Sequence, residues 1–206
     1  MQHSIKSSPS TCSLKFEKQA WDKGFSWIAG IDEVGRGALF GPVCAAAVVL
    51  NPNNIPYGIK DSKKLTAQKR LKLSKEIRSA AHDWAVAFID SSTIDQINIL
   101  EATRKAMYLA INKLKIKPDY LLCDAMELES IKIPQKSIVK GDIQSISIAA
   151  ASIIAKVERD HLVINLDIEF PGYDLKNNMG YGTKKHLESL RKLGPTDLHR
   201  HSFRGV

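Results

Sequence analysis

Short apolar segments of strand length alternate with longer segments of helical periodicity along this chain of 206 residues. From the N-terminus, the expected order is strand, strand, helix, strand, helix, strand, strand, helix. Strands that follow one another directly pair antiparallel, whereas strands separated by a helix pair in parallel. The order therefore predicts an α/β fold with a mixed five-stranded sheet flanked by helices and a C-terminal helical extension.

The boundaries of these elements follow from turn residues and helix caps. The expected strands are 27–33, 42–50, 84–90, 119–125 and 134–142, and the expected helices are 66–81, 93–117, 145–170 and 183–193. Thr66 and Thr183 are expected to cap their helices, and Thr93 with Gln96 predicts a capping box. We expect three parts: a flexible lead-in (1–20), a main α/β domain (21–170) and a C-terminal helical extension (171–206).

The charge and composition limit the possible partners. A formal charge of +8 and a pI of about 9.3 favour a polyanion such as nucleic acid, although a solvated basic surface is an alternative. Three scattered cysteines indicate neither disulfides nor zinc. The N-terminus has no signal-like apolar region, and no apolar run approaches the roughly 20 residues of a membrane span. A soluble, cytoplasmic protein that does not bind membranes is expected.

Acidic side chains end several of the apolar segments. Asp32 and Glu33 follow Trp27–Ile31, Asp124 ends a short strand, and Asp142 closes the last predicted strand. If the first and fourth strands are parallel neighbours, Asp32 and Asp124 lie side by side, and the other two acids complete a cluster. Such carboxylates repel one another unless divalent cations lie between them, and oxygen ligands favour Mg²⁺ or Mn²⁺. Two such ions are typical of phosphodiester hydrolysis. Taken singly, each acid is better explained as an ordinary loop or cap residue, so only the group as a whole indicates a metal site.

The adjacent pair, Asp32 and Glu33, raises a geometric problem. Successive side chains of a regular strand point to opposite faces of the sheet. We therefore expect the strand to lose its regularity at Glu33, and the glycines Gly35 and Gly37 to turn the chain back over the site.

Several motifs together resemble ribonuclease HII, the type 2 branch of the ribonuclease H enzymes. They are GIDEVGRG, DSKKLT (61–66), LLCDA, KGD (140–142), AAASIIAKVERD (149–160) and GYGTKKH (180–186). The resemblance extends from about residue 27 to the C-terminal GPTDLHRHSF. Two residues depart from the usual pattern, because Ala38 replaces a proline and Ala125 replaces a glycine. Both changes are expected to alter loop rigidity and fine substrate preference only.

The resemblance implies a ribonuclease-H-like catalytic domain (21–170) with a C-terminal helical substrate-binding extension (171–206). The activity that it implies is endonucleolytic hydrolysis of the RNA strand of RNA–DNA hybrids. It also implies cleavage on the 5′ side of single ribonucleotides in duplex DNA, leaving a 3′-hydroxyl and a 5′-phosphate, with roles in ribonucleotide and primer removal. The catalytic and metal-binding residues implied are Asp32, Glu33, Asp124 and Asp142, with two Mg²⁺ or Mn²⁺ ions. The residues implied in recognition of a ribonucleotide followed by DNA are Gly35, Arg36, Gly37 and Tyr181. A monomer is expected.

Further basic residues are candidates for phosphate contacts. Ser62, Lys63 and Lys64 precede a helix N-terminus, where phosphate binds readily, although a solvated charge run is the alternative. Lys156 and Arg159 on the long helix are placed to pair with substrate phosphate or with Asp160, for which a structural ion pair is expected.

For one tyrosine and three histidines, a structural role has to be considered beside a role in substrate or metal binding. Tyr181, between glycines, is either a stacking platform or an anchor for its own loop. His199 and His201 in HRHSF, and His186, lack partner residues at metal-ligand spacing, so structural or surface roles are expected.

Three other functions remain to be weighed. A dinucleotide-binding loop is disfavoured, because Gly35-x-Gly37-x-x-x-Gly41 leads into Pro42 and a strand rather than into a helix. A nucleic-acid-binding module without catalysis fits the charge but not the acids, which repel phosphates. The hybrid-specific relative, ribonuclease HIII, usually carries an additional N-terminal domain, and only about 26 residues precede the first strand here.

Overall fold

The computed structural model describes residues 12–59 and 65–206 and contains a five-stranded mixed sheet. The strands are β1 (Ile28–Val34), β2 (Val43–Val49), β3 (Asp83–Ile89), β4 (Tyr120–Asp124) and β5 (Gln135–Ile138). Their spatial order is β3-β2-β1-β4-β5. The β1–β2 and β2–β3 pairs are antiparallel, and the β1–β4 and β4–β5 pairs are parallel. The predicted fold class is confirmed.

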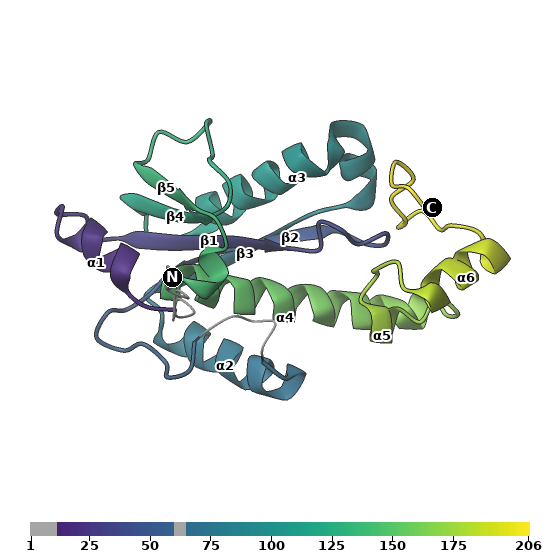
Figure 1. The fold of residues 1–206 in the computed structure, drawn as a ribbon, viewed down its shortest axis with the longest axis horizontal. Helices are drawn as coiled ribbons and strands as arrows, with labels where there is room; N and C mark the ends of the chain where they lie inside the picture. The colour runs from purple at the N-terminus through teal and green to yellow at the C-terminus, as the bar shows by residue number, and fades with distance from the viewer. Residues whose placement is uncertain (1–11, 60–64) are drawn as a thin grey trace, which may run out of the picture.

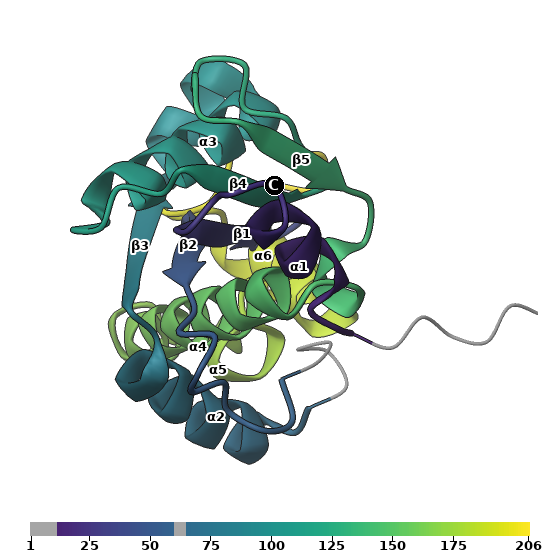
Figure 2. The same ribbon diagram turned by 90° about the vertical axis from the view of Figure 1, so that its left-hand side faces the viewer.

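Helices cover both faces of this sheet. They are α1 (Lys15–Trp21), α2 (Ala67–Ala80), α3 (Ser91–Lys113), α4 (Ile146–Glu169), α5 (Leu175–Asn178) and α6 (Lys184–Leu193), with a 3-10 turn, η2 (Gly141–Ile143). α3 lies on one face, while α4 lies on the other with α2 outside it (Figures 1 and 2). α5 and α6 lie near the far end of α4, and the β1–β2 connection extends toward them (Figure 1).

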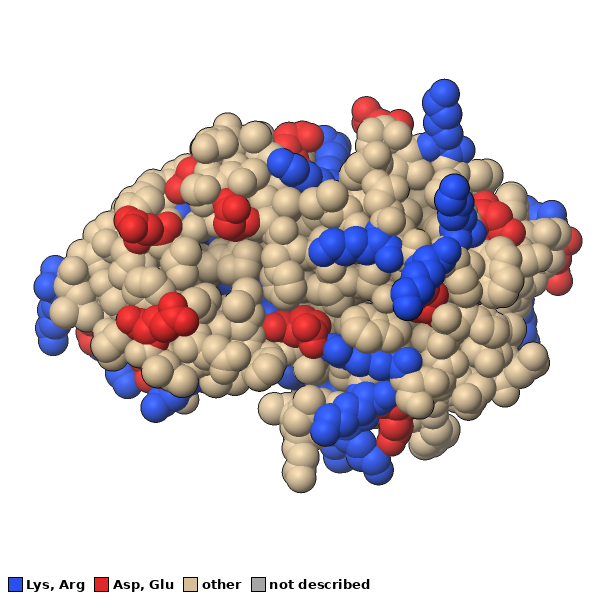
Figure 3. Space-filling model, turned by 180° about the vertical axis from the view of Figure 1, so that it is seen from behind, with Lys and Arg blue, Asp and Glu red and all other residues tan. Residues whose placement is uncertain are grey.

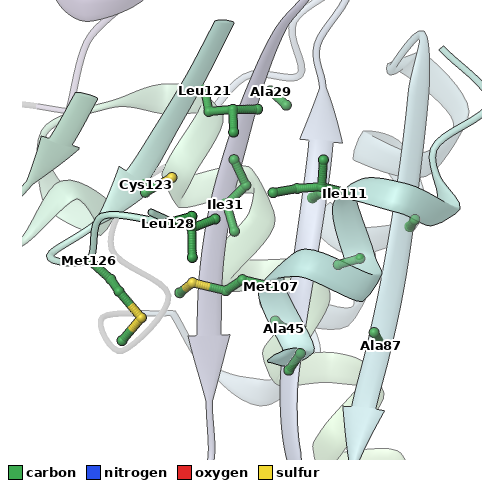
Figure 4. Close-up of a cluster of buried hydrophobic side chains, with 14 of the residues drawn as sticks. Ala29, Ile31, Ala45, Ala87, Met107, Ile111, Leu121, Cys123, Met126 and Leu128 are labelled. Atoms are coloured by element: carbon green, nitrogen blue, oxygen red, sulfur yellow. The ribbon is translucent and has the colours of Figure 1, made fainter. Parts of the chain in front are cut away.

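One hydrophobic core fills the space between α3 and the sheet. Figure 4 shows the side chains of Ile31 and Leu121 from the strands and Met107 from α3, all fully buried. Cys123 belongs to the same core, and Cys44 is buried on the opposite face, so both are small core residues as expected. Because alternate residues of β1 face this core, the residues between them face α4.

The opposite core depends on a close approach of α4 to β1. The first part of α4 is almost entirely buried, as its low charge predicts. A Cβ atom on Gly30 would lie 2.1 Å from the carbonyl carbon of Ser147, so only glycine permits this contact. The absence of a side chain at Gly30 therefore sets how closely α4 lies against the strand that carries Asp32.

Side-chain hydrogen bonds explain where most helices begin. Thr66 and Thr183 cap α2 and α6, as predicted, by accepting hydrogen bonds from Lys69 N and His186 N. The capping box at Thr93 is wrong, because Asp90 is the N-cap of α3. The helical path is also interrupted at Asn98 (φ 67°), whose side chain accepts hydrogen bonds from the next turn. The spacing of Thr93 and Gln96 in the sequence therefore predicted the wrong side chain as the acceptor at the start of α3.

Part of the expected lead-in is folded. α1 includes residues 15–20, and its Glu17 is 1% exposed. The Glu17 carboxylate accepts hydrogen bonds from the Ser145 hydroxyl (2.6 Å) and from Ser147 N (2.9 Å). A flexible lead-in up to residue 20 is therefore wrong for this segment, because Glu17 bonds to the N-cap residue and to the first turn of α4, where a negative charge is favourable. The boundary at residue 170 remains a prediction.

The described part of the chain contains no helix long and apolar enough to cross a bilayer. Basic side chains are prominent at the surface instead. Viewed from behind (Figure 3), Lys and Arg gather across the centre and along the lower edge, the level at which α2 lies in Figure 1.

Candidate active site

Parallel pairing of β1 with β4 brings Asp32 and Asp124 together. Ile31 pairs with Cys123 at the last step of this ladder, so Asp32 and Asp124 occupy the next position on the two strands. Both follow a residue that faces α3, and they therefore face α4. The Ser152 side chain, on α4, hydrogen-bonds to the Asp32 carboxylate.

Glu33 joins these two acids by a route that differs from our expectation. β1 remains regularly paired with β2 through Val34, so the predicted loss of strand regularity at Glu33 is wrong. The pairing with β4 ends earlier, at Ile31, and leaves the β4 side open beyond it. Carboxylate oxygens of Asp32, Glu33 and Asp124 all lie within 4.8 Å of one another. The longer glutamate side chain reaches past the end of the parallel ladder to its neighbours.

Asp142 lies in the same pocket but not at a strand end. β5 ends at Ile138, and Lys140 takes a left-handed conformation (φ 56°) before the 3-10 turn η2 that carries Asp142. The predicted strand through residue 142 is therefore too long. Gly141 N donates a 2.6 Å hydrogen bond to Asp124 Oδ1, which ties this turn to β4. Asp142 is 6% exposed and lines the pocket, outside the tighter group of three.

The pocket has a volume of about 340 Å³. Its walls combine acidic, basic and aromatic side chains, namely Asp32, Glu33, Val34, Arg70, Asp124, Asp142, Ser152, Lys156 and Tyr181. A larger, more open hollow of about 810 Å³ between α3 and the β4–β5 connection shares none of these residues. The chemistry of the side chains, rather than the size of the hollow, identifies the candidate site.

Burial and mutual repulsion disfavour the charged forms of two of these carboxylates. Burial raises the pKa of Asp32 well above its usual range, and the charges of Glu33 and Asp124 raise it further. Burial also raises the pKa of Glu33, although Arg36 opposes that shift. Arg36 Nη1 lies 3.3 Å from Glu33 Oε1. The cluster therefore holds more negative charge than its protein neighbours compensate.

The donor set fits a divalent cation. Glu33 Oε2 is buried and has no hydrogen-bond partner among the described residues. A buried, unpaired carboxylate oxygen is costly unless something else binds it. Oxygen ligands alone, without histidine or cysteine, suit Mg²⁺ or Mn²⁺.

Two basic side chains reach the pocket from the helices. Lys156 Nζ lies 2.7 Å from Asp160 Oδ1, and Arg70 Nη1 lies 3.8 Å from Asp160 Oδ2. Asp160 is thus the ion-pair partner that we expected. Arg70 was missed, because the sequence of α2 offers several basic residues, and only the packing of α2 against α4 shows which one faces the site.

The Gly35-Arg36-Gly37 turn lies beside the pocket. Ala38 N donates to Gly35 O (3.3 Å), and Gly35 takes a positive φ of 91° that favours glycine. Arg36 and Gly37 are exposed. Ala38 forms an antiparallel bridge with Tyr181, whose side chain also lines the pocket. The turn and the tyrosine, which are 144 positions apart in the sequence (Gly37 to Tyr181), are thereby brought together.

Arg159 does not have the role that the sequence suggested. It is fully buried, and its guanidinium donates only to backbone carbonyls, those of Phe40, Pro42 and Met179. The expected pairing with substrate phosphate or Asp160 is therefore wrong. Helical spacing places Arg159 one turn from Lys156, but the side chain points beneath the glycine turn rather than into the pocket.

The three histidines lie outside the acidic pocket. His186 and His199 are fully buried, and their Nε2 atoms lie 3.2 Å apart, which agrees with a structural role. His201 is exposed, as expected for a surface residue. Ala125, at the position where the resemblance predicts glycine, takes a positive φ of 47°. Ser62, Lys63 and Lys64 lie outside the described residues.

Comparisons with known proteins agree with this geometry. The family model described as Ribonuclease HII matches residues 29–206. The chain is 51% identical over 192 residues to ribonuclease HII of Syntrophomonas wolfei, covering 93% of this chain and 75% of that protein. It is 53% identical over 189 residues to ribonuclease HII of Enterococcus faecalis, covering 92% and 74%.

A solved structure gives the same fold. The ribonuclease H2 of Pyrococcus horikoshii superposes with a TM-score of 0.73 at 27% identity, covering 87% of this chain and 95% of that chain. The likeness therefore extends over most of the chain.

Proposed function

The chain belongs to the ribonuclease HII family, and from this premise we propose that it cuts duplex DNA on the 5′ side of single embedded ribonucleotides by two-metal hydrolysis. Members of this family are metal-dependent endonucleases that cleave the RNA strand of RNA–DNA hybrids. The observation that carries the proposal is the group of three carboxylates within 4.8 Å, one of which has a buried, unpaired oxygen.

Asp32, Glu33, Asp124 and Asp142 are the residues that would hold the ions. Divalent cations bound there supply an activated water and neutralise the charge that develops on the leaving 3′-oxygen. The protein's own part is to hold the four side chains in place before substrate arrives. β1 and β4 position the first three, and the Gly141–Asp124 hydrogen bond positions the turn that carries Asp142.

Lys156 and Arg70 bring positive charge to the wall of an acidic pocket. Asp160 holds both cations, so their side chains lose little freedom when a phosphate binds. In this proposal they attract and orient the backbone phosphates next to the scissile bond.

Recognition of the ribonucleotide is assigned to the Gly35-Arg36-Gly37 turn and Tyr181. The 2′-hydroxyl is the group that distinguishes RNA from DNA, and an exposed glycine turn lets backbone amides and carbonyls approach it closely. Tyr181, half-buried at the pocket wall, offers a ring on which a sugar or base can stack. A cut that leaves a 3′-hydroxyl would suit a role in removal of ribonucleotides and primers from DNA.

A nucleic-acid-binding module without catalysis is the alternative. Such a protein would gain nothing from buried acids, because carboxylates repel the phosphates that it binds. The proposal also includes a monomeric, cytoplasmic enzyme that uses Mg²⁺ or Mn²⁺.

A cleavage assay on three duplexes tests the proposed function. The substrates are all-DNA, DNA with one ribonucleotide, and a full RNA–DNA hybrid, each with Mg²⁺, with Mn²⁺ and with a chelator. We expect metal-dependent cleavage of the second and third, with a 3′-hydroxyl product 5′ of the single ribonucleotide. If the duplex with one ribonucleotide stays intact under both metals while the hybrid is cut, the finer specificity is wrong.

A further inference from the structure

Two arginines are fully buried beneath the β1–β2 connection. Arg159 comes from α4 and Arg200 from the C-terminal segment, and both are 0% exposed. Neither forms an ion pair with another described residue, and all their side-chain hydrogen bonds go to backbone carbonyls. Burial of a charge without a counter-ion is costly, so these two side chains need an explanation.

Arg159 connects the glycine turn with the loop of Tyr181. Its three nitrogens donate to Pro42 O (2.9 Å), Phe40 O (3.0 Å) and Met179 O (2.8 Å). The guanidinium carbon lies 5.6 Å from the centre of the Tyr181 ring. A Cβ atom at Gly35 would lie 2.0 Å from Arg159 Nε, so the turn rests directly on this side chain.

Arg200 holds the other side of the same connection. Its Nη1 donates to Arg36 O (2.8 Å), its Nε to Gly41 O (2.9 Å), and its backbone N to Leu39 O (2.8 Å). Arg36 is the central residue of the glycine turn, so Arg200 contacts the proposed recognition element itself. In Figure 1 the C-terminal segment lies near the end of the β1–β2 connection, which agrees with these bonds.

The segment that carries Arg200 is itself anchored to the catalytic domain. The carboxylate of Asp95, on α3, accepts hydrogen bonds from His201 N and Ser202 N, both at 2.9 Å. Arg200 therefore links the start of α3 to the glycine turn. Five planar N–H donors satisfy several carbonyls at once, which a lysine ammonium cannot do in the same geometry.

We propose that Arg159 and Arg200 are positioning residues that hold the Gly35-Arg36-Gly37 turn at a fixed distance from Tyr181, so that the preference for a ribonucleotide joined to DNA depends on these two buried guanidiniums. The inference rests on the proposed function. Neither arginine contacts the substrate; each acts through the carbonyls that it binds.

The test is Arg200→Lys, which keeps the charge but loses the planar fork. Its matched control is Arg204→Lys, an exposed position four residues further along the same segment. For both variants, kcat and KM are measured on the duplex with one ribonucleotide and on the full hybrid. Amide hydrogen exchange is measured for Leu39 and Phe40, whose N–H groups bond to Gly180 O.

For Arg200→Lys we expect kcat/KM on the single ribonucleotide to fall about tenfold further than on the hybrid, as misplacement of a binding group predicts. Exchange at Leu39 and Phe40 should quicken, while β1 amides keep their protection. Arg204→Lys should change neither. If kcat/KM fell equally on both substrates, Arg200 would have only a structural role and the inference would be overturned. Unchanged exchange at Leu39 and Phe40 would also overturn it, because the turn would then not depend on Arg200.

A second variant covers the case in which Arg200→Lys does not fold. Asp95→Asn weakens the anchor of the same segment from the partly exposed surface of α3 and should shift the ratio in the same direction. If the wild type fails to cut the single ribonucleotide, the proposed function fails instead. If Tyr181→Ala changes the ratio but Asp95→Asn and Arg159→Lys do not, the function stands and the inference fails.

Discussion

The Nε2 atoms of His186 and His199 face each other at 3.2 Å in the interior of the C-terminal extension. His199 Nδ1 accepts a hydrogen bond from Thr196 N, so the proton of a neutral His199 lies on Nε2 and is donated to His186. His186 Nδ1 then donates to Tyr181 O at 2.9 Å. This chain of bonds requires both imidazoles to be neutral and ends at the backbone of the tyrosine assigned to recognition.

The histidine pair predicts a stability that falls in mild acid. Burial, aided by the nearby His186 and His201, lowers the pKa of His199 to about 4, and burial also lowers the pKa of His186. The unfolded chain protonates His199 near pH 6.5, whereas the folded chain does so only near pH 4. The contribution of His199 to stability is therefore fully present above pH 6.5 and is lost as the pH falls toward 4. We expect a loss on the order of 2 kcal/mol by pH 4.5, measured by urea unfolding.

His199→Asn isolates this contribution from other titrating groups. The variant should be less stable at pH 7.5 and should lose less stability than the wild type on going to pH 4.5. His161→Asn, at an exposed position on α4, should follow the wild-type curve. A His199→Asn curve parallel to the wild type would show that the pair does not govern the pH dependence.

Replacement of Asp32 by Asn should separate stability from activity. The buried Asp32 carboxylate is repelled by Glu33 and Asp124. Its neutral replacement should therefore raise the unfolding free energy in a chelator by about 1 kcal/mol, while cleavage falls at least about 100-fold. The increase in Tm that Mg²⁺ or Mn²⁺ gives the wild type should be largely lost.

Asp22→Asn is the matched control, because Asp22 is exposed at the end of α1. Calorimetry with and without metal, combined with the cleavage assay, measures all three quantities. Wild-type turnover by Asp32→Asn would rule out the assigned metal site.

Gly30→Ala should be one of the most damaging substitutions in the sheet. The new Cβ atom would lie 2.1 Å from the Ser147 backbone, which can move only if the start of α4 moves. We expect a loss of at least about 3 kcal/mol, together with reduced activity, since α4 also carries Ser152 and Lys156. Gly37→Ala is the contrasting variant: no heavy atom lies within 4 Å of its Cβ position, and its stability should change by less than about 1 kcal/mol. Comparable unfolding free energies for the two would contradict the packing argument.

Tyr181 should matter more for a single ribonucleotide than for a continuous hybrid. Removal of the ring in Tyr181→Ala should lower kcat/KM on the single ribonucleotide by about tenfold or more, whereas stacking should survive in Tyr181→Phe. The hybrid offers neighbouring ribonucleotides and should be less affected. Equal losses on both substrates would indicate that Tyr181 only anchors its loop.

The local sequence was sufficient for much of the fold. Strands separated by helical segments predict parallel pairing within the sheet, and the parallel pairing of β1 with β4, which the expected acid cluster required, is present. Thr66 and Thr183 were identified as caps because their oxygens bond within one helical turn. These features depend on contacts between residues close in sequence, or on a burial pattern that composition reveals directly.

Errors arose where a distant partner decides the outcome. The direction of the Glu33 side chain depends on the residue at which β4 stops pairing with β1. The sequence around Glu33 does not specify that residue. The buried position of Glu17 depends on Ser145 and Ser147, more than a hundred residues away. Arg159 has the same helical spacing from Lys156 whether it binds phosphate or carbonyls, and only the folded β1–β2 connection distinguishes the two.

Three features therefore follow from the sequence alone: the acids near strand ends, the glycine turn that follows the first pair, and the likeness to the family. All three depend only on residue type and spacing along the chain. The rest depends on the tertiary structure, because β1, β4, α4 and the C-terminal segment must meet first. That structure determines which carboxylate oxygens come together, which basic side chain faces the pocket and which guanidinium lies beneath the glycine turn. The physical reason is that a side chain's charge is local, whereas its burial and its partners belong to the assembled fold.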